Sequence, residues 1–264
     1  MPVRTPICPE VGFTKRALRF FNEDEIFVGI GVGDPWDDED SPPTLAIGAR
    51  GLGYIENTSS HGATLDEDNC SVEFNLTCFQ AGIESYKIIG IGSNQYEIIR
   101  VSDDSVLATG LAGSATGRQN VVDGLTFTVT ATSITEDDYM IFKVDGPIAF
   151  KKCETVKLVV PDDDGEIEYY NGNFREVTEE NAFIEKVRHV YVEAVFRYDQ
   201  HPLVDYRQVA VFTGLVRADG VSGSKNNLLP SEVETSGWVE MLVNDVAVVR
   251  EIQDRQYHTL IVEF

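Results

Sequence analysis

Basic residues and long hydrophobic runs are scarce in this chain of 264 residues. Lys and Arg number 21 against 44 Asp and Glu, so the formal net charge is −23. A protein that binds phosphates must offer cations, and this shortage argues against nucleic acid and anionic membranes as partners. No run approaches the roughly 20 apolar residues of a membrane helix. We therefore expect neither nucleic acid nor membrane as a partner, and assembly in a cytoplasm.

Cysteine is also scarce, and its four positions show no metal-binding spacing. Cys70 and Cys78 fall on one predicted strand, CSVEFNLTC, where eight steps span about 26 Å. A disulfide needs Cα atoms within about 7 Å, so these two cannot pair unless the strand folds back. We expect isolated thiols at all four positions, Cys8, Cys70, Cys78 and Cys153.

No arrangement typical of a catalytic site can be found in the sequence. The four histidines, His61, His189, His201 and His258, are widely spaced, and no nucleophile lies in a known catalytic motif. Three alternating glycines (29, 31 and 33) follow an apolar strand, but the acidic, proline-containing DPWDDEDSPP replaces the helix that a nucleotide site requires. We therefore expect no catalytic residue, no cofactor and no enzyme activity.

Three acidic clusters raise the question of calcium, which prefers oxygen ligands. They lie at residues 37–40, 66–68 and 162–166. None has carboxylates at the alternating positions of a calcium loop, so we expect solvated loops and no metal. The cluster at Asp162 is the best of the three candidates for calcium.

Most of the chain alternates polar with apolar residues or runs in β-branched and aromatic ones, which indicates strands separated by Gly, Asn and Asp turns. We predict a mostly β protein of antiparallel sheets packed as a sandwich, with few short helices. The segments that carry this prediction include IFVGIGV, YKIIGIG, QYEIIRV, YMIFKV, HVYVEAVFRY, YRQVAVFTGLV and HTLIVEF.

Helix signals are few. Thr14 is predicted to cap a short helix over KRALRFFNED, and Thr178 precedes a possible second helix of a turn or two. Near the end of the chain we expect a turn at Asn244-Asp245 between two strands, followed by a terminal strand. An edge strand of this kind must be covered, by this chain or by a second copy.

The pattern of loops predicts two domains. Residues 66–160 form a β meander with short turns and are predicted to be inserted into an outer, discontinuous domain of residues 1–65 and 180–264. The acidic stretch 161–179 is predicted to connect them. No repeat of solenoid period is visible.

Four residues are candidates for a protein interface. Trp36 follows Pro35 on a stiff acidic turn, and an aromatic side chain on such a loop is a frequent interface anchor, although Trp36 folded over its own domain is an equal alternative. Trp238 opens a late strand and Phe264 closes the chain.

The two ends of the chain together resemble a known family, the small dimeric baseplate wedge subunit of T-even-type contractile-tailed phages. The similar pieces are KRALRFFNE, IFVGIGVGDPW with Pro42-Pro43, YRQVAVFTGL, SGWVEMLVND and HTLIVEF, in the same order. The chain departs from the family where Asn244-Asp245 replaces a proline-rich turn and where the middle is short. That middle resembles, more faintly, the β domains of flagellar hook-associated proteins.

The resemblance implies a structural role in the virion, in the tail baseplate. Its implied partners are a second copy of the chain, as a homodimer, and other baseplate wedge proteins. The residues themselves leave alternatives open: a free-standing β-sandwich module that recognises glycans or surfaces with calcium, a hydrolase whose carboxylates are distant in sequence, or a flagellar or pilus component.

Overall fold

The computed structural model describes residues 10–32, 54–74, 83–123, 125–145, 147–170, 172–248 and 255–264. In these residues the chain has one α-helix, α1 (Glu10–Phe21), and two 3-10 turns, η1 (Glu179–Asn181) and η2 (Pro230–Glu232). The rest of the regular structure is strands, and all their pairings are antiparallel. The prediction of a mostly β, antiparallel fold is confirmed.

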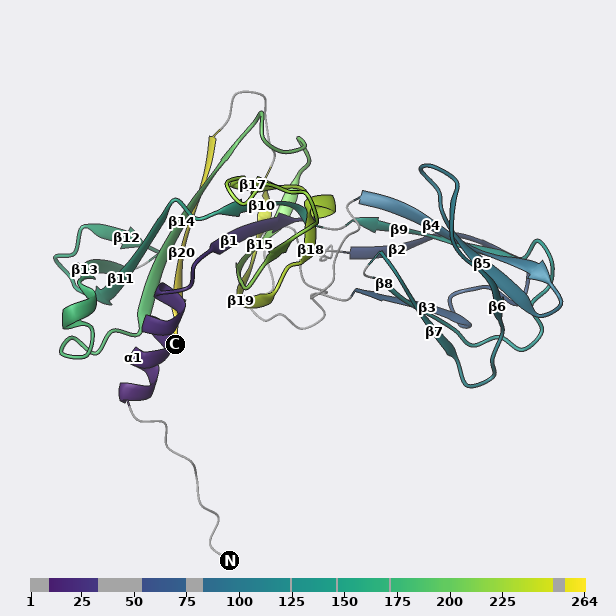
Figure 1. Cartoon of the computed structure of the whole chain (residues 1–264), viewed down its shortest axis with the longest axis horizontal. Coiled ribbons are helices and arrows are strands. Elements are labelled where there is room, and N and C mark those ends of the chain that lie inside the picture. Colours follow the sequence, from purple (N-terminus) through teal and green to yellow (C-terminus); the bar gives the residue numbers. More distant parts are fainter. Residues whose placement is uncertain are drawn as a thin grey trace, which may run out of the picture.

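Two five-stranded sheets form the first group of strands, drawn on the left of Figure 1. The first sheet has the order β17 (Asn227–Leu228), β10 (Pro147–Lys152), β1 (Ile26–Gly31), β15 (Tyr206–Thr213), β19 (Trp238–Val248). The second has the order β12 (Ile167–Tyr169), β13 (Gly172–Val177), β11 (Thr155–Pro161), β14 (His189–Arg197), β20 (Arg255–Glu263).

Strand β1 explains how this group is layered. All six of its residues are buried. Val28 and Ile30 belong to the core that joins the two sheets and α1, whereas Phe27 belongs to a second core on the opposite face. That face is covered by the segment that contains β16 (Val216–Arg217), β18 (Val233–Thr235) and η2. A strand covered on both faces is continuously apolar, as IFVGIG is.

The second group of strands, on the right of Figure 1, has its own core. Its five-stranded sheet has the order β2 (Tyr54–His61), β9 (Tyr139–Asp145), β4 (Ile83–Gly92), β5 (Gln95–Arg100), β6 (Ser105–Ala112). Its three-stranded sheet has the order β3 (Cys70–Phe74), β8 (Leu125–Val129), β7 (Arg118–Val122). Phe127 and Phe142, with ring centroids 5.3 Å apart, lie in the core of this group.

The strand pairing bears on the predicted domain boundaries without testing them. Strand β10 and all but the last residue of β11 fall within 66–160, yet these strands pair with β1 and β14 of the first group. The acidic stretch 161–179 contains the β12–β13 hairpin of the same group. The division into an outer and an inserted domain stays a prediction, and the pairing favours an insertion close to the span from β2 to β9.

Two local predictions are wrong. Helix α1 begins at Glu10, and Thr14 lies inside it with its side chain buried and its hydroxyl donating to the Glu10 carbonyl at 3.5 Å. No turn forms at Asn244-Asp245, because β19 continues through it beside β15. There the side-chain amide N–H of the buried Gln208 donates a hydrogen bond to Asn244 at 2.8 Å, which links the two strands. The second predicted helix is the short turn η1, after Thr178.

A cluster of charges ties the covering segment to the start of β1. Arg217 donates to both carboxylate oxygens of Glu25, and Lys152 pairs with Glu25 at 3.0 Å. Hydrogen bonds from Arg217 hold the pKa of the Glu25 carboxyl below its ordinary value of 4.5, against the effect of burial, and Lys152 lowers it further. The guanidinium also lies over the Phe27 ring, 5.4 Å from its centroid. The cluster therefore joins β1, β10 and β16 at one point.

We expect Glu25→Gln to lower the free energy of unfolding at pH 7 by about 1–3 kcal/mol, because it breaks charge-assisted hydrogen bonds. Since the Glu25 pKa is lower in the folded state, its contribution is complete above about pH 4.5 and is lost as the pH falls through the folded-state pKa. Urea unfolding between pH 3 and 7 should show the variant converging with wild type at low pH. The exposed Glu23→Gln is the control; a gap that persists unchanged at pH 3 would contradict this assignment.

Because each of the two groups of strands has its own core, we expect the two groups to unfold in separate transitions. Phe142→Ala should cost about 3–5 kcal/mol and lower only the transition of the second group, whereas Phe196→Ala should lower only that of the first group. Calorimetry of both variants measures this. A single transition that both variants shift equally would show that the two groups unfold as one unit.

Candidate assembly surface

Two of the four interface candidates, Trp238 and Phe264, line one depression between α1 and β19. We call it the α1–β19 depression; its volume is about 560 Å³ and its lining residues are Arg16, Arg19, Phe20, Glu23, Thr213, Gly214, Trp238, Glu240 and Phe264. The structure therefore brings together residues that stand 26 positions apart in sequence, next to a helix near the start of the chain. Pro35 and Trp36 lie outside the described residues.

Phe264 lines the depression next to Phe20 of α1. Its ring centroid is 5.4 Å from that of Phe20, and it packs against the core between the sheets. Its backbone N–H donates to the Arg188 carbonyl at 2.9 Å. Phe264 therefore fixes the end of the chain against α1 and leaves only part of its ring for a partner.

Trp238 forms a wall and is 71% exposed. The preceding Gly237 has φ +74°, and a Cβ on it would lie 2.1 Å from the Thr213 carbonyl oxygen. Gly214 has φ +67°, and a Cβ on it would lie 3.6 Å from the Trp238 ring. The backbones of two glycines thus approach each other closely where β15 ends and β19 begins, and they set the position of the indole.

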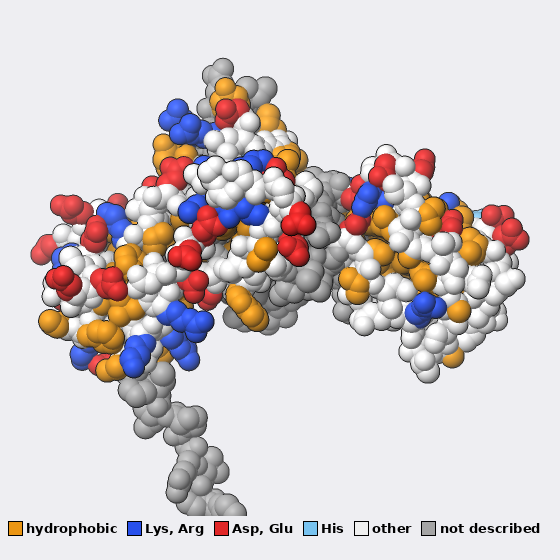
Figure 2. Space-filling view, viewed as in Figure 1, with side chains coloured by type: hydrophobic (Ala, Val, Ile, Leu, Met, Phe, Trp, Pro, Cys, Tyr) orange, Lys and Arg blue, Asp and Glu red, His pale blue; other side chains and the backbone are white. Residues whose placement is uncertain are grey.

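The helical wall carries the cations of the depression. Ala17 and Phe20 face the core, so Arg16 and Arg19 face outward, with Lys15 beside them. Figure 2 shows Lys and Arg side chains gathered around α1, at the lower left. Across the depression the Glu240 carboxylate accepts a hydrogen bond from the Thr213 hydroxyl at 2.6 Å.

Long edge strands border both sheets of the first group. β20 pairs with β14 over nine residues, from His189 opposite Glu263 to Arg197 opposite Arg255. β19 pairs with β15. Neither strand has a partner strand on its other side among the residues that the structure describes. The terminal strand is thus paired on one side by β14 within the part of the chain that the structure describes.

A second depression, which the sequence analysis missed, lies beside β12. Its volume is about 390 Å³, and its lining residues are Glu166, Ile167, Glu168, Tyr169, Tyr170, Tyr191 and Thr259. Tyr170 is 75% exposed, and burial raises the pKa of the neighbouring Tyr169 to about 12. The two adjacent tyrosines in an acidic stretch were the sequence feature that could have indicated this depression. Only the β12–β13 hairpin, however, places them opposite β14 and β20.

The acidic cluster at Asp162 is engaged by a cation of the chain itself. Arg175 pairs with the Asp162 carboxylate at 2.8 Å, and the backbone N–H of Asp164 donates to it at 3.1 Å. The hydrogen bond from Arg175 is the main cause of the lowered Asp162 pKa. Across the described ranges no group of His, Cys, Asp and Glu side chains is arranged to hold a metal ion.

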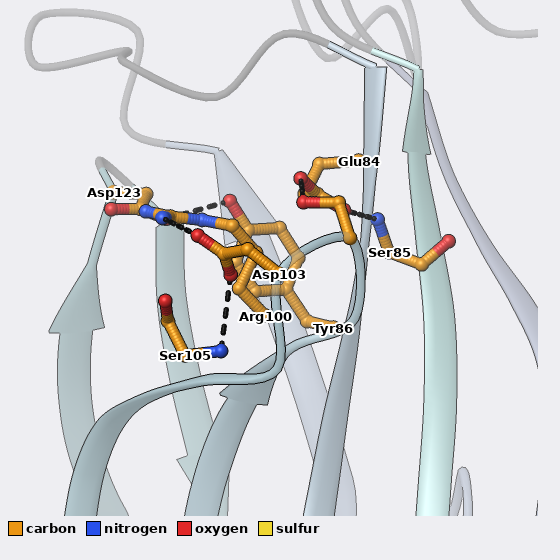
Figure 3. Close-up of polar contacts among 8 residues, drawn as sticks. Glu84, Ser85, Tyr86, Arg100, Asp103, Ser105 and Asp123 are labelled. Atoms are coloured by element: carbon orange, nitrogen blue, oxygen red, sulfur yellow. Dashed lines mark hydrogen bonds and ion pairs between the residues drawn. The ribbon is translucent and has the colours of Figure 1, made fainter.

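A polar cluster at one end of the second group joins two of its turns (Figure 3). Asp123 accepts hydrogen bonds from Arg100 at 2.6 Å and from the Tyr86 hydroxyl at 3.0 Å, and Arg100 also pairs with Asp103 at 3.2 Å. Burial raises the Tyr86 pKa, and the Asp123 charge adds to this effect. Because these groups bind one another, the cluster fixes the turn after β5 to the turn after β7.

The remaining candidate groups have structural surroundings. Cys70 and Cys153 are free thiols, as predicted, and burial raises both pKa values to about 12. His189 lies on β14, as predicted, 5.6 Å from the Phe174 ring centroid, and burial lowers its pKa. Cys8 and Cys78 lie outside the described residues. None of the described helices has the length and apolar character needed to span a membrane.

An antiparallel sandwich with open edge strands and an exposed, rigidly held tryptophan is typical of proteins that assemble with others. The comparison with known families agrees with this class. The chain belongs to the family described as baseplate wedge 3 tail fiber network component, whose pattern matches residues 130–264. It is therefore a structural component of a phage tail baseplate. The matched residues include β19, β20, Trp238 and Phe264, whereas α1 and β1 lie outside them.

A curated relative supports the same assignment. The chain is 32% identical over 103 residues to "Virion protein 3" of Enterococcus phage phiEF24C, which is 37% of this chain and 56% of that protein. The chain thus spans about half the length of this relative. The recognition of a phage baseplate wedge-type subunit is confirmed.

Gly237→Ala should destabilise the protein by more than about 2 kcal/mol, because both the positive φ and the close carbonyl oxygen oppose a side chain. Gly220→Ala is the matched control: its φ is +83° but a Cβ there meets nothing within 4 Å, so about 1 kcal/mol is expected. Chemical denaturation compares the two, and equal losses would show that the contact with Thr213 is unimportant.

Proposed function

We propose that this protein is a wedge subunit of a contractile-tail baseplate, which binds itself as a homodimer and binds other wedge proteins during assembly in the host cytoplasm. Its role is structural and involves no catalysis. The observation that carries the proposal is the family match over residues 130–264, which contains both long edge strands and the exposed Trp238.

The edge strands support the homodimer. A strand of nine or eleven residues with an unpaired edge readily pairs with another chain, and proteins normally cover such edges. Tyr257 on β20 is 61% exposed and Val239 on β19 is 38% exposed, so apolar surface accompanies the backbone groups. A second copy that pairs through the same strand on a twofold axis covers the edge of that strand in both chains and closes the assembly.

The calcium-dependent binding module receives less support. Its best candidate site, Asp162, is paired with Arg175, and calcium would have to displace this guanidinium. A calcium titration followed by thermal melting distinguishes a calcium-dependent binding module from a baseplate wedge subunit, because a bound ion raises the melting temperature of the protein. We expect no shift at millimolar calcium.

The dimer is tested by light scattering coupled to size exclusion, where the expected mass is twice the 29.3 kDa of the chain. In hydrogen exchange, the amides of the edge strand that pairs, 238–248 or 255–263, should be protected to a degree similar to the central strands β14 and β15, and dilution to monomer should release them. A monomer at all concentrations with fast exchange in both strands would contradict homodimerisation. Mass spectrometry of purified phage baseplates tests the wedge role separately.

A further inference from the structure

The cations of α1 stand out because the rest of the chain is acidic. Among the described residues, Lys15, Arg16 and Arg19 form no ion pair, although acidic residues outnumber basic ones by 44 to 21. Arg19 and Glu23 are four residues apart, a spacing that allows pairing on a helix, and they do not pair. Several cations elsewhere are paired within the chain, such as the exposed Lys186 with Glu10 at 2.8 Å and the half-exposed Lys157 with Glu176 at 2.6 Å.

These cations lie beside apolar surface. Arg16 and Arg19 share the α1–β19 depression with Trp238 and with the partly exposed ring of Phe264. Arg and Trp are the residue types most enriched at the energetic centres of protein interfaces. Where an arginine lies next to an indole, the guanidinium binds a carboxylate of a partner and the indole packs against an apolar side chain of that partner.

We propose that the α1–β19 depression binds an acidic segment of a different baseplate protein. Carboxylates of that segment pair with Arg16 and Arg19, and an apolar side chain between them packs on Trp238. This inference rests on the proposed function and adds to it the site and chemistry of one partner.

The charges of the depression favour a peptide over a polyanion. Glu23 and Glu240 also line it, so a continuous row of phosphates would meet repulsion at these two positions. A peptide can place its carboxylates near the arginines alone. The partner is thus recognised by separated negative charges together with an apolar side chain.

Symmetry favours a different protein over a second copy. The edge strands proposed for the dimer form a self-complementary contact that closes after two chains. A second copy inserted into the depression by another of its surfaces would make a head-to-tail contact, which builds a ring or an open chain of subunits and not a closed dimer. A closed twofold dimer carries two copies of the depression and needs neither of them for its own closure.

The first experiment introduces Arg16→Glu together with Arg19→Glu into the phage genome. We expect the amount of this protein in purified baseplates to fall by about tenfold or more, because reversed charges repel the acidic segment. The purified variant should keep its melting temperature, since both side chains are exposed. Arg118→Glu, an exposed cation of β7 in the second group, is the matched control and should be incorporated normally.

The second experiment uses a carbodiimide, which joins an amine to a carboxylate in direct contact, on purified baseplates. Lys15, or lysine introduced by Arg16→Lys or Arg19→Lys, should link to an Asp or Glu of another protein. The intrachain pairs Lys186–Glu10 at 2.8 Å and Lys157–Glu176 at 2.6 Å are positive controls for the reaction.

Three results would overturn the inference: normal incorporation of the charge-reversed variant, no link from positions 15, 16 and 19 while the control pairs react, or links only to another copy of this chain. Failure of the proposed function is a different result, namely absence of the wild-type protein from purified baseplates.

Discussion

The burial of β1 on both faces is the constraint on which the rest of this structure depends. Its residues belong to the core between the two sheets on one face and to the core beneath the covering segment on the other. A strand so enclosed must pair on both edges, and β10 and β15 do this. The Glu25–Arg217 contact then holds the covering segment where β1 begins.

This central strand also determines where the assembly surface lies. Because Ile26 is paired with Thr213, the end of β15 is fixed next to the start of β1, and α1 immediately precedes that point. Gly214 and Gly237 then allow β19 to begin beside β15 with Trp238 facing outward. In the function that we propose, these edge strands and the exposed indole make contact with other subunits.

Sequence patterns correctly predicted the strands that have one or two buried faces. They failed where contacts with other elements of the fold decide the local structure. HVYVEAVFR and YRQVAVFT are strands as their β-branched residues predict. Asn244-Asp245 has the composition of a turn, but β19 continues beside β15, with Gln208 opposite Asn244 and an irregularity in the pairing before Tyr206 opposite Val248. Thr14 is a residue type that often caps helices. Its side chain is buried in the core, however, and the helix begins before it, at Glu10.

The sequence by itself determined the β class, the shortage of cations and the two aromatic candidates Trp238 and Phe264, because side-chain alternation and charge are local properties of the chain. Only the tertiary structure decided that these two residues meet α1 at one depression, and that the arginines there form no ion pair with another described residue. The tyrosine-lined depression beside β12 likewise depends on strands that are distant in sequence. Contacts of this kind arise when strands that are far apart in the sequence pair with each other. No repeating pattern along the chain predicts which strands meet.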